Sequence, residues 1–558
     1  MQSFRQYRRI GAHVSAAAAS LNQRRDVPST SKTATEHDLN DGVKQESNTP
    51  TQSEDPNNQQ QVPVAAYPFV DWDASDKHLA PRNWSTARRT AAFIIIWINC
   101  FAVDWPATAD AGTSSKAVEH FGQSKWAACL GAALYTFGIA VGALFAGPIS
   151  ETVGRNPIYV GSRIWNVIWL AVAAPAPNFA TYCVARFFAG TGGSIILAIH
   201  AASIADLYDP IDRTLAWPTV AMASFSSTML APVASGWIAK STTLSFRWAD
   251  YISLIISGAV VLVTLLFLPE TFAPILLKWK ATHLRRITGN SNHISRLEQQ
   301  PTLATRLHAA FLRAAHMFTR EPIVILLGVW LVLVYIIVYG FVQSFSFVFG
   351  VTYGWNKGQV GSAFGAICMG VFLWYASAPL YWLFYKRKVA LIRPTLHEKE
   401  QDVHVAGIDL PPPEYRLWSA APVAPALPIS LFWLAWTNYA SISPWSSLSA
   451  MALFGICWAG IYVTVYNYIL DVYGIYAGSA LAIITFFRYT ASAGISMVSR
   501  PMYLNIHVHW SMTLFGCLAL VLAPVPLALA YIGPKLREKS RFASEYAREA
   551  RERIDSKA

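Results

Sequence analysis

Four ionisable side chains interrupt long apolar stretches of the sequence and are the first candidates for chemistry. Asp104 lies in "INCFAVDWPATAD", Asp110 follows six residues later, Arg186 opens "RFFAGTGGS", and His200 lies further along that run. An ionisable group in hydrocarbon is costly and is a functional candidate by default. Because carboxylates and imidazoles exchange protons, we expect this group of residues to couple proton movement to another process.

Each of the four residues also has a simpler interpretation. Asp104 lies about fourteen residues, or about 20 Å, into its apolar run, and the alternative is that it ends a helix at the Trp-Pro pair. Asp110 lies a turn and a half further on, near the opposite surface. The alternatives for Arg186 and His200 are an arginine that reaches the membrane interface and a satisfied core histidine.

The composition indicates what must position these groups. The chain has 558 residues, 54% hydrophobic and 14% charged, with a mean hydropathy of +0.32. Soluble domains carry about a quarter charged residues, so this is a membrane composition, and the 21 Trp and 24 Tyr suit interface belts. The net charge of +12 falls between the apolar runs, which favours a membrane orientation signal over nucleic-acid binding. The six cysteines lie within apolar runs and indicate neither disulfides nor a metal site.

About twenty apolar residues cross a bilayer as a helix, and twelve such spans are predicted, six on each side of a basic segment. They lie near 90–110, 126–148, 157–177, 180–205, 216–239, 249–269, 322–350, 360–385, 420–440, 446–470, 477–500 and 510–533. The expected fold class is all-α integral membrane, with twelve transmembrane helices in two six-helix bundles. Transporters commonly use two such repeats, with the substrate bound between them.

The expected domain organisation follows from the same pattern. It consists of a disordered cytosolic tail (1–87), a first bundle (88–270), a cytosolic middle loop (271–320), a second bundle (321–533) and a cytosolic tail (534–558). Lys and Arg concentrate in the middle loop, in 386–416 and after Gly533, so these segments and both termini are placed in the cytosol. The sequon at Asn83 then lies on the cytosolic side, and no glycosylation is expected.

The short break "GPISETVGRNP" (147–157) separates two apolar runs. Gly154 permits a tight turn there, and Pro157 suits the first turn of the next helix. Glu151 and Arg155 are expected to pin this turn to neighbouring helix ends, as a charged latch that forms in one state of a rocking protein and breaks in the other.

This break resembles the loop signature of the major facilitator superfamily, in the form found in fungal twelve-span drug/proton antiporters. Seven more stretches are similar to that family in the same order. They are "DWDASDKHLAPRNWS", "RFFAGTGGS", "LPETFAPILLKWKATHLRR", "TREPIVILLGVW", "PPPEYRLWSAAPVAPALPISLFW", "YNYILDVYGIYAGSALA" and "GPKLREKSRFA". The resemblance covers nearly everything after residue 70 and implies the major facilitator fold. Asn156 stands where the family usually has a second basic residue.

The resemblance also implies roles for individual residues. Arg186 matches an arginine implicated in proton coupling, and it is expected to approach Asp104 in one conformation. Asp206 and Asp471 match positions at the cytosolic ends of spans, where they are expected to act as helix-end latches. In the fifth-span motif, Pro232 is kept as a helix kink with Gly236 after it, but the usual paired glycines are absent from "LAPVASGWIA".

A set of aromatic side chains is expected to line a cavity for a planar or apolar substrate, although packing against lipid or other helices explains them equally well. The set is Trp105, Tyr135, Phe341, Phe345, Trp458, Tyr462 and Tyr466.

The function that fits these features best is proton-coupled export of hydrophobic or amphipathic small molecules by alternating access. The runner-up is an exporter of polyamines or organic cations, which should show more deep carboxylates in the second half. A membrane enzyme and a transporter-like sensor are the alternatives from other classes. The chain lacks HExxH, GxSxG and P-loop motifs, so it is not expected to be an enzyme or an ATP-driven pump.

The remaining expectations concern partners and location. No cofactor and no metal are expected. The expected partners are a small-molecule substrate, protons and the lipid bilayer, without nucleic acid, and the chain is expected to be a monomer. The plasma membrane is the first expectation for its location, and the vacuolar membrane is the alternative.

Overall fold

The computed structural model describes residues 2–25, 69–73, 76–124, 127–397 and 412–555. Within these residues every regular element is a helix and none is a strand, so the expected all-α class is confirmed. The chain forms two compact units. The larger contains Met1–Ser3, Pro81–Ala273 and Pro301–Ala558, and the smaller contains Phe4–Ala80 and Pro274–Gln300.

The first half of the larger unit consists of six long helices and one short helix. They are α2 (Thr86–Thr108), α3 (Ser114–Phe121), α4 (Leu130–Val153), α5 (Arg155–Ala173), α6 (Phe179–Leu207), α7 (Pro210–Lys240) and α8 (Trp248–Phe267). Local signals set the boundaries. The Asn178 side chain accepts a hydrogen bond from the N–H of Thr181 at the start of α6, and Pro210 is the first residue of α7.

The second half of the larger unit follows after Pro301. Its helices are α10 (Leu303–Arg320), α11 (Pro322–Phe345), α12 (Lys357–His397), α13 (Val423–Thr437), α14 (Pro444–Tyr473), α15 (Ala477–Leu522), α16 (Val525–Lys539) and α17 (Arg541–Asp555). A π-helical turn, Ser346–Val351, extends α11. His507 has φ 64° and ψ 164°, so α15 is two helical segments joined at this residue.

The larger unit supplies the twelve membrane segments that the sequence predicts. Among the residues that the structure describes, eight stretches are long and apolar enough to cross a membrane. The last of them, Pro444–Lys539, contains α14, α15 and α16. The helices α5 and α7 are more polar, but their 19 and 31 residues also suffice to span a bilayer. With α15 divided at His507 and its second segment counted together with α16, each half then contributes six segments.

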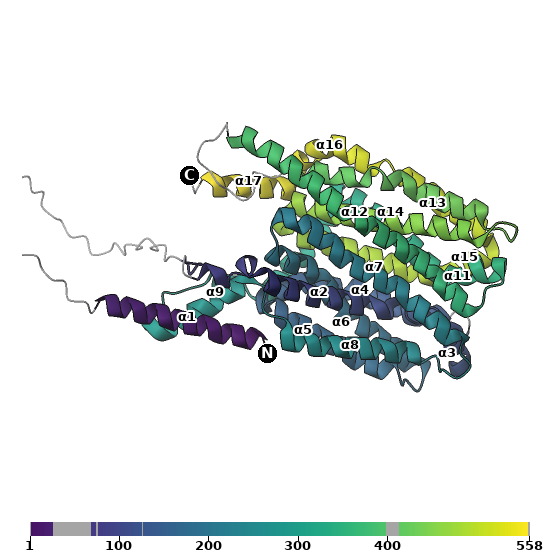
Figure 1. Ribbon diagram of the computed structural model, residues 1–558, viewed down its shortest axis with the longest axis horizontal. Helices are drawn as coiled ribbons and strands as arrows, with labels where there is room; N and C mark the ends of the chain where they lie inside the picture. Colours follow the sequence, from purple (N-terminus) through teal and green to yellow (C-terminus); the bar gives the residue numbers. More distant parts are fainter. Residues whose placement is uncertain (1, 26–68, 74–75, 125–126, 398–411, 556–558) are drawn as a thin grey trace, which may run out of the picture. The chain divides into compact units, whose positions relative to one another are not determined.

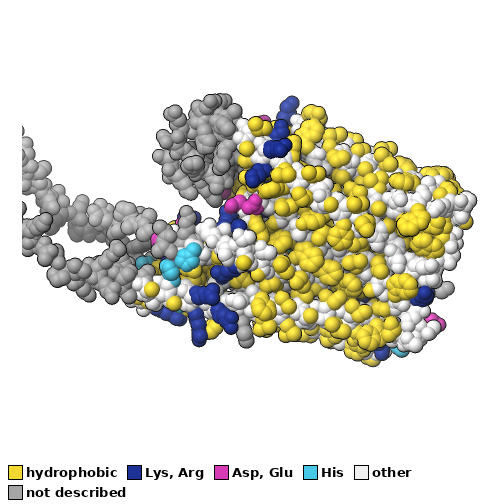
Figure 2. Space-filling view, viewed as in Figure 1, with side chains coloured by type: hydrophobic (Ala, Val, Ile, Leu, Met, Phe, Trp, Pro, Cys, Tyr) yellow, Lys and Arg dark blue, Asp and Glu magenta, His cyan; other side chains and the backbone are white. Residues whose placement is uncertain are grey.

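The two halves pack against each other along α7 with α12 and α4 with α15. Figure 1 shows α2, α4, α5, α6 and α8 in one group, and α12 to α16 in the other. The sides of these helices carry hydrophobic side chains, as Figure 2 shows, and many of them are exposed, among them Ile255, Leu262, Leu380 and Val521. Such a surface suits contact with lipid. Cys517 is also exposed, whereas the sequence had placed all the cysteines in the interior.

In the smaller unit, helix α1 (Gln2–Arg25) corrects part of the expected disordered tail. Ile10 and Val14, one helical turn apart, pack with Leu276 of α9 (Ala273–Thr288), and burying this apolar stripe favours the helix. The rest of the expected tail falls mainly on residues 26–68, which lie outside the described residues. The expected middle loop 271–320 likewise contains α9 and α10.

Candidate transport site

Asp104 lies inside α2 and is 3% exposed. Ser224 of α7 and Tyr489 of α15 lie beside its carboxylate, so helices of both halves meet there. Among the described residues no cation lies within ion-pair distance of Asp104, although ion pairs fix the carboxylates of Asp110 and Asp250. A buried carboxylate without an ion pair has no counter-charge in contact with it that fixes its charged form.

The local backbone also bears on the role of Asp104. The helix α2 continues through Pro106 to Thr108, so Asp104 does not end a helix at the Trp-Pro pair. The charged neighbours at longer range are Arg488 of α15 and Arg163 of α5.

Arg186 is completely buried and forms ion pairs with two carboxylates. Its Nη2 lies 3.2 Å from Asp110 Oδ2 and 3.1 Å from Asp250 Oδ1. Its Nε and Nη2 donate to the Tyr182 hydroxyl at 3.0 and 2.9 Å, and its Nη1 donates to the Pro106 carbonyl at 2.6 Å. In this conformation Arg186 therefore binds Asp110 and Asp250 and not Asp104, which differs from the expected approach to Asp104.

Asp250 is a member of this cluster that the sequence analysis missed. It lies in the first turn of α8 and is 2% exposed. Its position at the start of the apolar run "YISLIISGAVVLV" was the available signal. With one cation and two carboxylates in the cluster, the protein holds Arg186 in place through the termini of α2 and α8.

His200 is 2% exposed, and its ring stacks on Trp217 of α7 with 4.9 Å between centroids. This contact begins a continuous series of rings that crosses between the halves. Trp217 lies 5.3 Å from Tyr466 of α14, and Tyr466 lies 4.3 Å from Tyr462. His200 is thus part of an aromatic core and not part of the Asp104 surroundings.

Three of the seven expected cavity aromatics, Trp458, Tyr462 and Tyr466, come together in this series. Trp458 lies 4.2 Å from Phe225 of α7 and 6.0 Å from Tyr335 of α11. We call the rings of Trp217, Phe225, Tyr335, Trp458, Tyr462, Tyr466 and Tyr489 the central aromatic cluster.

The other four expected cavity residues lie elsewhere. Phe341 and Phe345 pack with Phe454 and Phe364. Tyr135 donates a hydrogen bond of 2.8 Å to the Val103 carbonyl, and Trp105 contacts Phe101. These rings contribute to helix packing in this structure.

Arg488, which the sequence analysis left without a role, lies within the central aromatic cluster. Its guanidinium carbon is 4.2 Å from the ring centroid of Tyr335 and 4.6 Å from that of Tyr489. The rings of Tyr462 and Tyr466 follow at 5.2 and 5.8 Å. The arginine is 2% exposed. The signal available in the sequence was one arginine inside the apolar run "LAIITFFRYTASAGIS".

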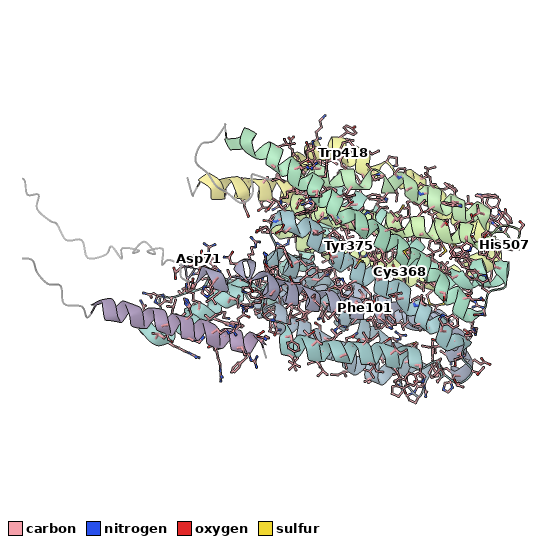
Figure 3. All side chains as sticks on the ribbon, viewed as in Figure 1. Asp71, Phe101, Cys368, Tyr375, Trp418 and His507 are labelled. Atoms are coloured by element: carbon pink, nitrogen blue, oxygen red, sulfur yellow. The ribbon has the colours of Figure 1, made fainter. Side chains whose placement is uncertain are left out.

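A small pocket lies beside this cluster, with about 150 Å³ of empty volume. Phe225 and Met222 of α7, Trp374 and Tyr375 of α12, and Ala459 of α14 contribute to its lining. Tyr375 lies on α12 and Phe101 on α2, as Figure 3 shows. The space between the lining side chains has no room for a water molecule, so the helices must separate to admit a drug-sized molecule here.

The turn after α4 depends on Gly154, which has φ 105°, a backbone conformation that disfavours side chains. The next residues begin α5, and their N–H groups bind the carboxylate of Glu270. Arg155 N and Asn156 N donate to it at 3.0 and 3.1 Å. Burial raises the pKa of Glu270, and the donors of Phe272, Arg155 and Asn156 act in the opposite direction. Glu270 is a further residue that the sequence analysis missed.

Arg155 and Glu151 bind neighbouring helices, as expected of a latch, but they use separate partners. Arg155 Nε lies 3.1 Å from Asp206 Oδ2 at the end of α6, and Arg306 Nη2 of α10 lies 2.8 Å from Glu151 Oε2. The side chain of Asn156 donates to the Leu268 carbonyl at 2.7 Å, so it fixes the same turn without a charge.

Asp471 joins the two halves at the same end of the unit. Arg213 of α7 donates to Asp471 Oδ1 at 2.9 Å, and Arg416 donates to Asp471 Oδ2 at 2.7 Å. Arg416 also donates to the Thr214 hydroxyl of α7 at 2.8 Å. The pair Arg213–Asp471 and the pair Arg416–Thr214 each connect the first half to the second.

The helices α7 and α12 cross closely toward the opposite end. A Cβ atom on Gly236 would lie 2.8 Å from the Lys357 carbonyl oxygen and 2.9 Å from Gly361 Cα. A Cβ atom on Gly361 would lie 2.8 Å from the Pro232 carbonyl oxygen. The close packing therefore persists at Gly236 despite the missing paired glycines.

Comparisons with known proteins agree with this architecture. The family model of the Major Facilitator Superfamily matches residues 89–497. The MFS-type transporter kojT of Aspergillus flavus is 39% identical over 474 residues, which cover 85% of this chain and 82% of the relative. The MFS-type efflux pump MFS2 of Trichophyton rubrum is 32% identical over 480 residues, which cover 86% of this chain and 78% of the relative.

A solved structure gives the same result for the fold. The proton:xylose symporter XylE aligns with a TM-score of 0.56 and 15% identity, over 80% of this chain and 96% of its own. The relatives that match over most of the chain are transporters and not enzymes. The chain belongs to the major facilitator superfamily and is a multi-pass membrane transporter.

Proposed function

We propose that this transporter exports hydrophobic or amphipathic small molecules, such as drugs, toxins or secondary metabolites, in exchange for protons. The observation that carries the proposal is Asp104, a buried carboxylate that forms no ion pair with any described residue. It lies where α2 of the first half meets α15 of the second. The name of the Trichophyton rubrum relative, an efflux pump, supports the direction of transport.

The mechanism requires Asp104 to meet the two sides of the membrane in turn. Protonation neutralises the carboxylate, and deprotonation leaves a charge in a low-dielectric region, so the two forms favour different arrangements of the halves. The contacts that would alternate are those that join the halves, namely Arg213–Asp471 at one end and the crossing of Gly236 with Gly361 at the other.

Arg186 has a positioning role in this mechanism. Its ion pairs occupy Asp110 and Asp250, and the attraction of an opposite charge at this distance opposes their protonation. Asp104 is then the deep carboxylate that remains available for proton exchange.

The orientation proposed from the sequence is retained, with both termini and the Gly154 turn in the cytosol and the plasma membrane as the first location. The ion pairs of Arg155, Arg213 and Arg306 gather at the Gly154 end, in agreement with the positive-inside rule.

The test uses the purified full chain in liposomes that contain a planar dye, with an imposed pH difference. Three dyes of different charge form the panel: fluorescein, a neutral coumarin and rhodamine 6G. Dye movement should require the pH difference and should stop when a protonophore collapses it. The Asp104→Asn variant keeps the shape of the side chain but cannot titrate, so its dye flux should be independent of the pH difference.

The matched control is Asp209→Asn, because Asp209 is an exposed aspartate of the same bundle. It should transport like the parent. If the parent moves none of the dyes, or if Asp104→Asn keeps the parental response to pH, the proposal is wrong.

A further inference from the structure

Arg488 is a buried cation whose donors are not satisfied by the protein. Its Nε and Nη1 have no hydrogen-bond partner among the described residues, and no carboxylate there lies within ion-pair distance of it. A buried charge without a counter-charge in contact is unfavourable, and contact with aromatic rings offsets only part of this cost. A site that retains this cation is therefore incomplete without an anionic partner.

Two other buried arginines have more protein partners than Arg488 has. Arg186 binds Asp110 and Asp250. Arg163 donates from Nη2 to the Asn99 carbonyl at 2.5 Å and from Nε to its side-chain oxygen at 3.3 Å. Protein groups thus take up the donors of Arg186, and Asn99 binds Nε and Nη2 of Arg163. Nη1 of Arg163 has no hydrogen-bond partner among the described residues. Arg488 differs from both because its Nε and Nη1 lie among aromatic rings.

The rings around Arg488 fix its position and also define the shape of a ligand. Tyr335, Tyr462, Tyr466 and Tyr489 lie with their centroids 4.2–5.8 Å from the guanidinium carbon. The near-parallel rings of Tyr462 and Tyr466, with 27° between their planes, offer faces on which a flat ring stacks. The cluster joins α11, α14 and α15 of the second half with α7 of the first, so a ligand here would contact both halves.

We propose that Arg488 and the surrounding tyrosines bind a planar organic anion, such as a phenolate, an enolate or an aromatic carboxylate, as the exported substrate. The guanidinium donates to the anionic oxygen, and the aromatic rings pack on the flat ring of the substrate. This inference rests on the proposed export function and narrows its substrate class. A fixed central cation repels polyamines and organic cations, so it disfavours the runner-up function.

The test measures binding to the full chain in detergent micelles with two dyes that share a flat xanthene ring. Fluorescein is the anionic probe and rhodamine 6G is the cationic probe. The parent should bind fluorescein more tightly than rhodamine 6G. The Arg488→Gln variant should bind fluorescein about 10- to 100-fold more weakly, because it lacks a charge-assisted hydrogen bond, with no loss of rhodamine 6G binding.

Two further variants keep the result interpretable. Arg488→Lys keeps the charge without the planar fork and should bind fluorescein with an intermediate affinity. Arg500→Gln is the matched control, because Arg500 lies on the same helix and should leave both affinities unchanged. Size-exclusion profiles show whether each variant is folded.

The inference is overturned if the parent prefers rhodamine 6G, or if a folded Arg488→Gln variant binds fluorescein like the parent. If every Arg488 variant fails to fold, the relative affinity of the parent for fluorescein and rhodamine 6G still decides whether the site prefers an anion. Transport that depends on the pH difference but favours the neutral or cationic dye would refute this inference alone. Binding of fluorescein through Arg488 without any response to the pH difference would refute the proton coupling alone.

Discussion

Arg213 of α7 donates a hydrogen bond of 2.9 Å to Asp471 of α14 and so joins the two halves of the transporter. The opposite oxygen of Asp471 is held by Arg416 of the same half. Loss of Arg213 therefore removes a contact between the halves without leaving Asp471 unpaired.

The Arg213→Gln substitution is expected to favour opening at this end. A coupling energy of about 1–3 kcal/mol corresponds to a change of about 5- to 150-fold in the ratio of the two states, and the partial exposure of this pair, at 15% and 12%, predicts the lower part of that range. Reactivity of cysteines introduced on the two ends of α7 measures the ratio. Arg548→Gln, which removes an exposed ion pair on α17, is the control. Equal cysteine reactivity in the Arg213→Gln and Arg548→Gln variants would show that the Arg213–Asp471 pair does not act as a latch.

The cluster around Arg186 should dominate the stability of the first half. Arg186→Gln leaves Asp110 and Asp250 buried without a cation, and breaking a buried pair in this way costs about 3–5 kcal/mol. We expect a lower unfolding temperature in detergent and a low yield. Adding Asp110→Asn and Asp250→Asn to this variant should restore part of the stability, because no uncompensated charge remains. A triple variant less stable than Arg186→Gln would contradict this electrostatic explanation.

Packing at the crossing of α7 with α12 gives a third prediction. Gly236→Ala places a Cβ atom 2.8 Å from the Lys357 carbonyl oxygen, and such overpacking costs about 1–3 kcal/mol. Gly258→Ala is the control, because no atom lies within 4 Å of the added Cβ atom there. Thermal unfolding should separate the two variants. Equal unfolding temperatures would show that α7 and α12 can accommodate the added Cβ atom without a loss of stability.

Much of the fold could be predicted from the sequence, because long apolar runs and the placement of Lys and Arg depend on local composition. The break in α15 at His507 falls between the spans predicted at 477–500 and 510–533, but the backbone conformation of His507 could not be predicted from the sequence. Helix α1 was also missed, because its apolar stripe, Ile10 and Val14, is short and is buried only through α9.

The candidate site was predicted less completely than the fold. Asp104 was found because a carboxylate in an apolar run stands out by itself. The partners of Arg186 and the surroundings of Arg488 depend on contacts between helices far apart in the chain, which a single sequence does not reveal. Asp250 and Glu270 lie near the ends of a span, where a charged residue is unremarkable until its partners are known.

The orientation of the chain gives a fourth prediction. Asn83 belongs to the sequon "NWS" just before α2, and the proposed cytosolic side excludes it from glycosylation. Treatment of the protein from its producing cells with an endoglycosidase should leave its mass unchanged, with Asn83→Gln as the reference. A mass shift that is absent from Asn83→Gln would reverse the proposed orientation.

The most direct test of proton exchange at Asp104 measures the movement of protons and not of substrate. Liposomes with the full chain, a pH-sensitive dye trapped inside and no initial pH difference receive a gradient of a transported compound. Antiport predicts that protons move opposite to the compound and that the internal pH changes accordingly. Asp104→Asn should abolish this proton movement while the compound still equilibrates, and Asp209→Asn should behave like the parent. Movement of the compound without any pH change in the parent, or an unchanged pH response in Asp104→Asn, would contradict proton exchange at Asp104.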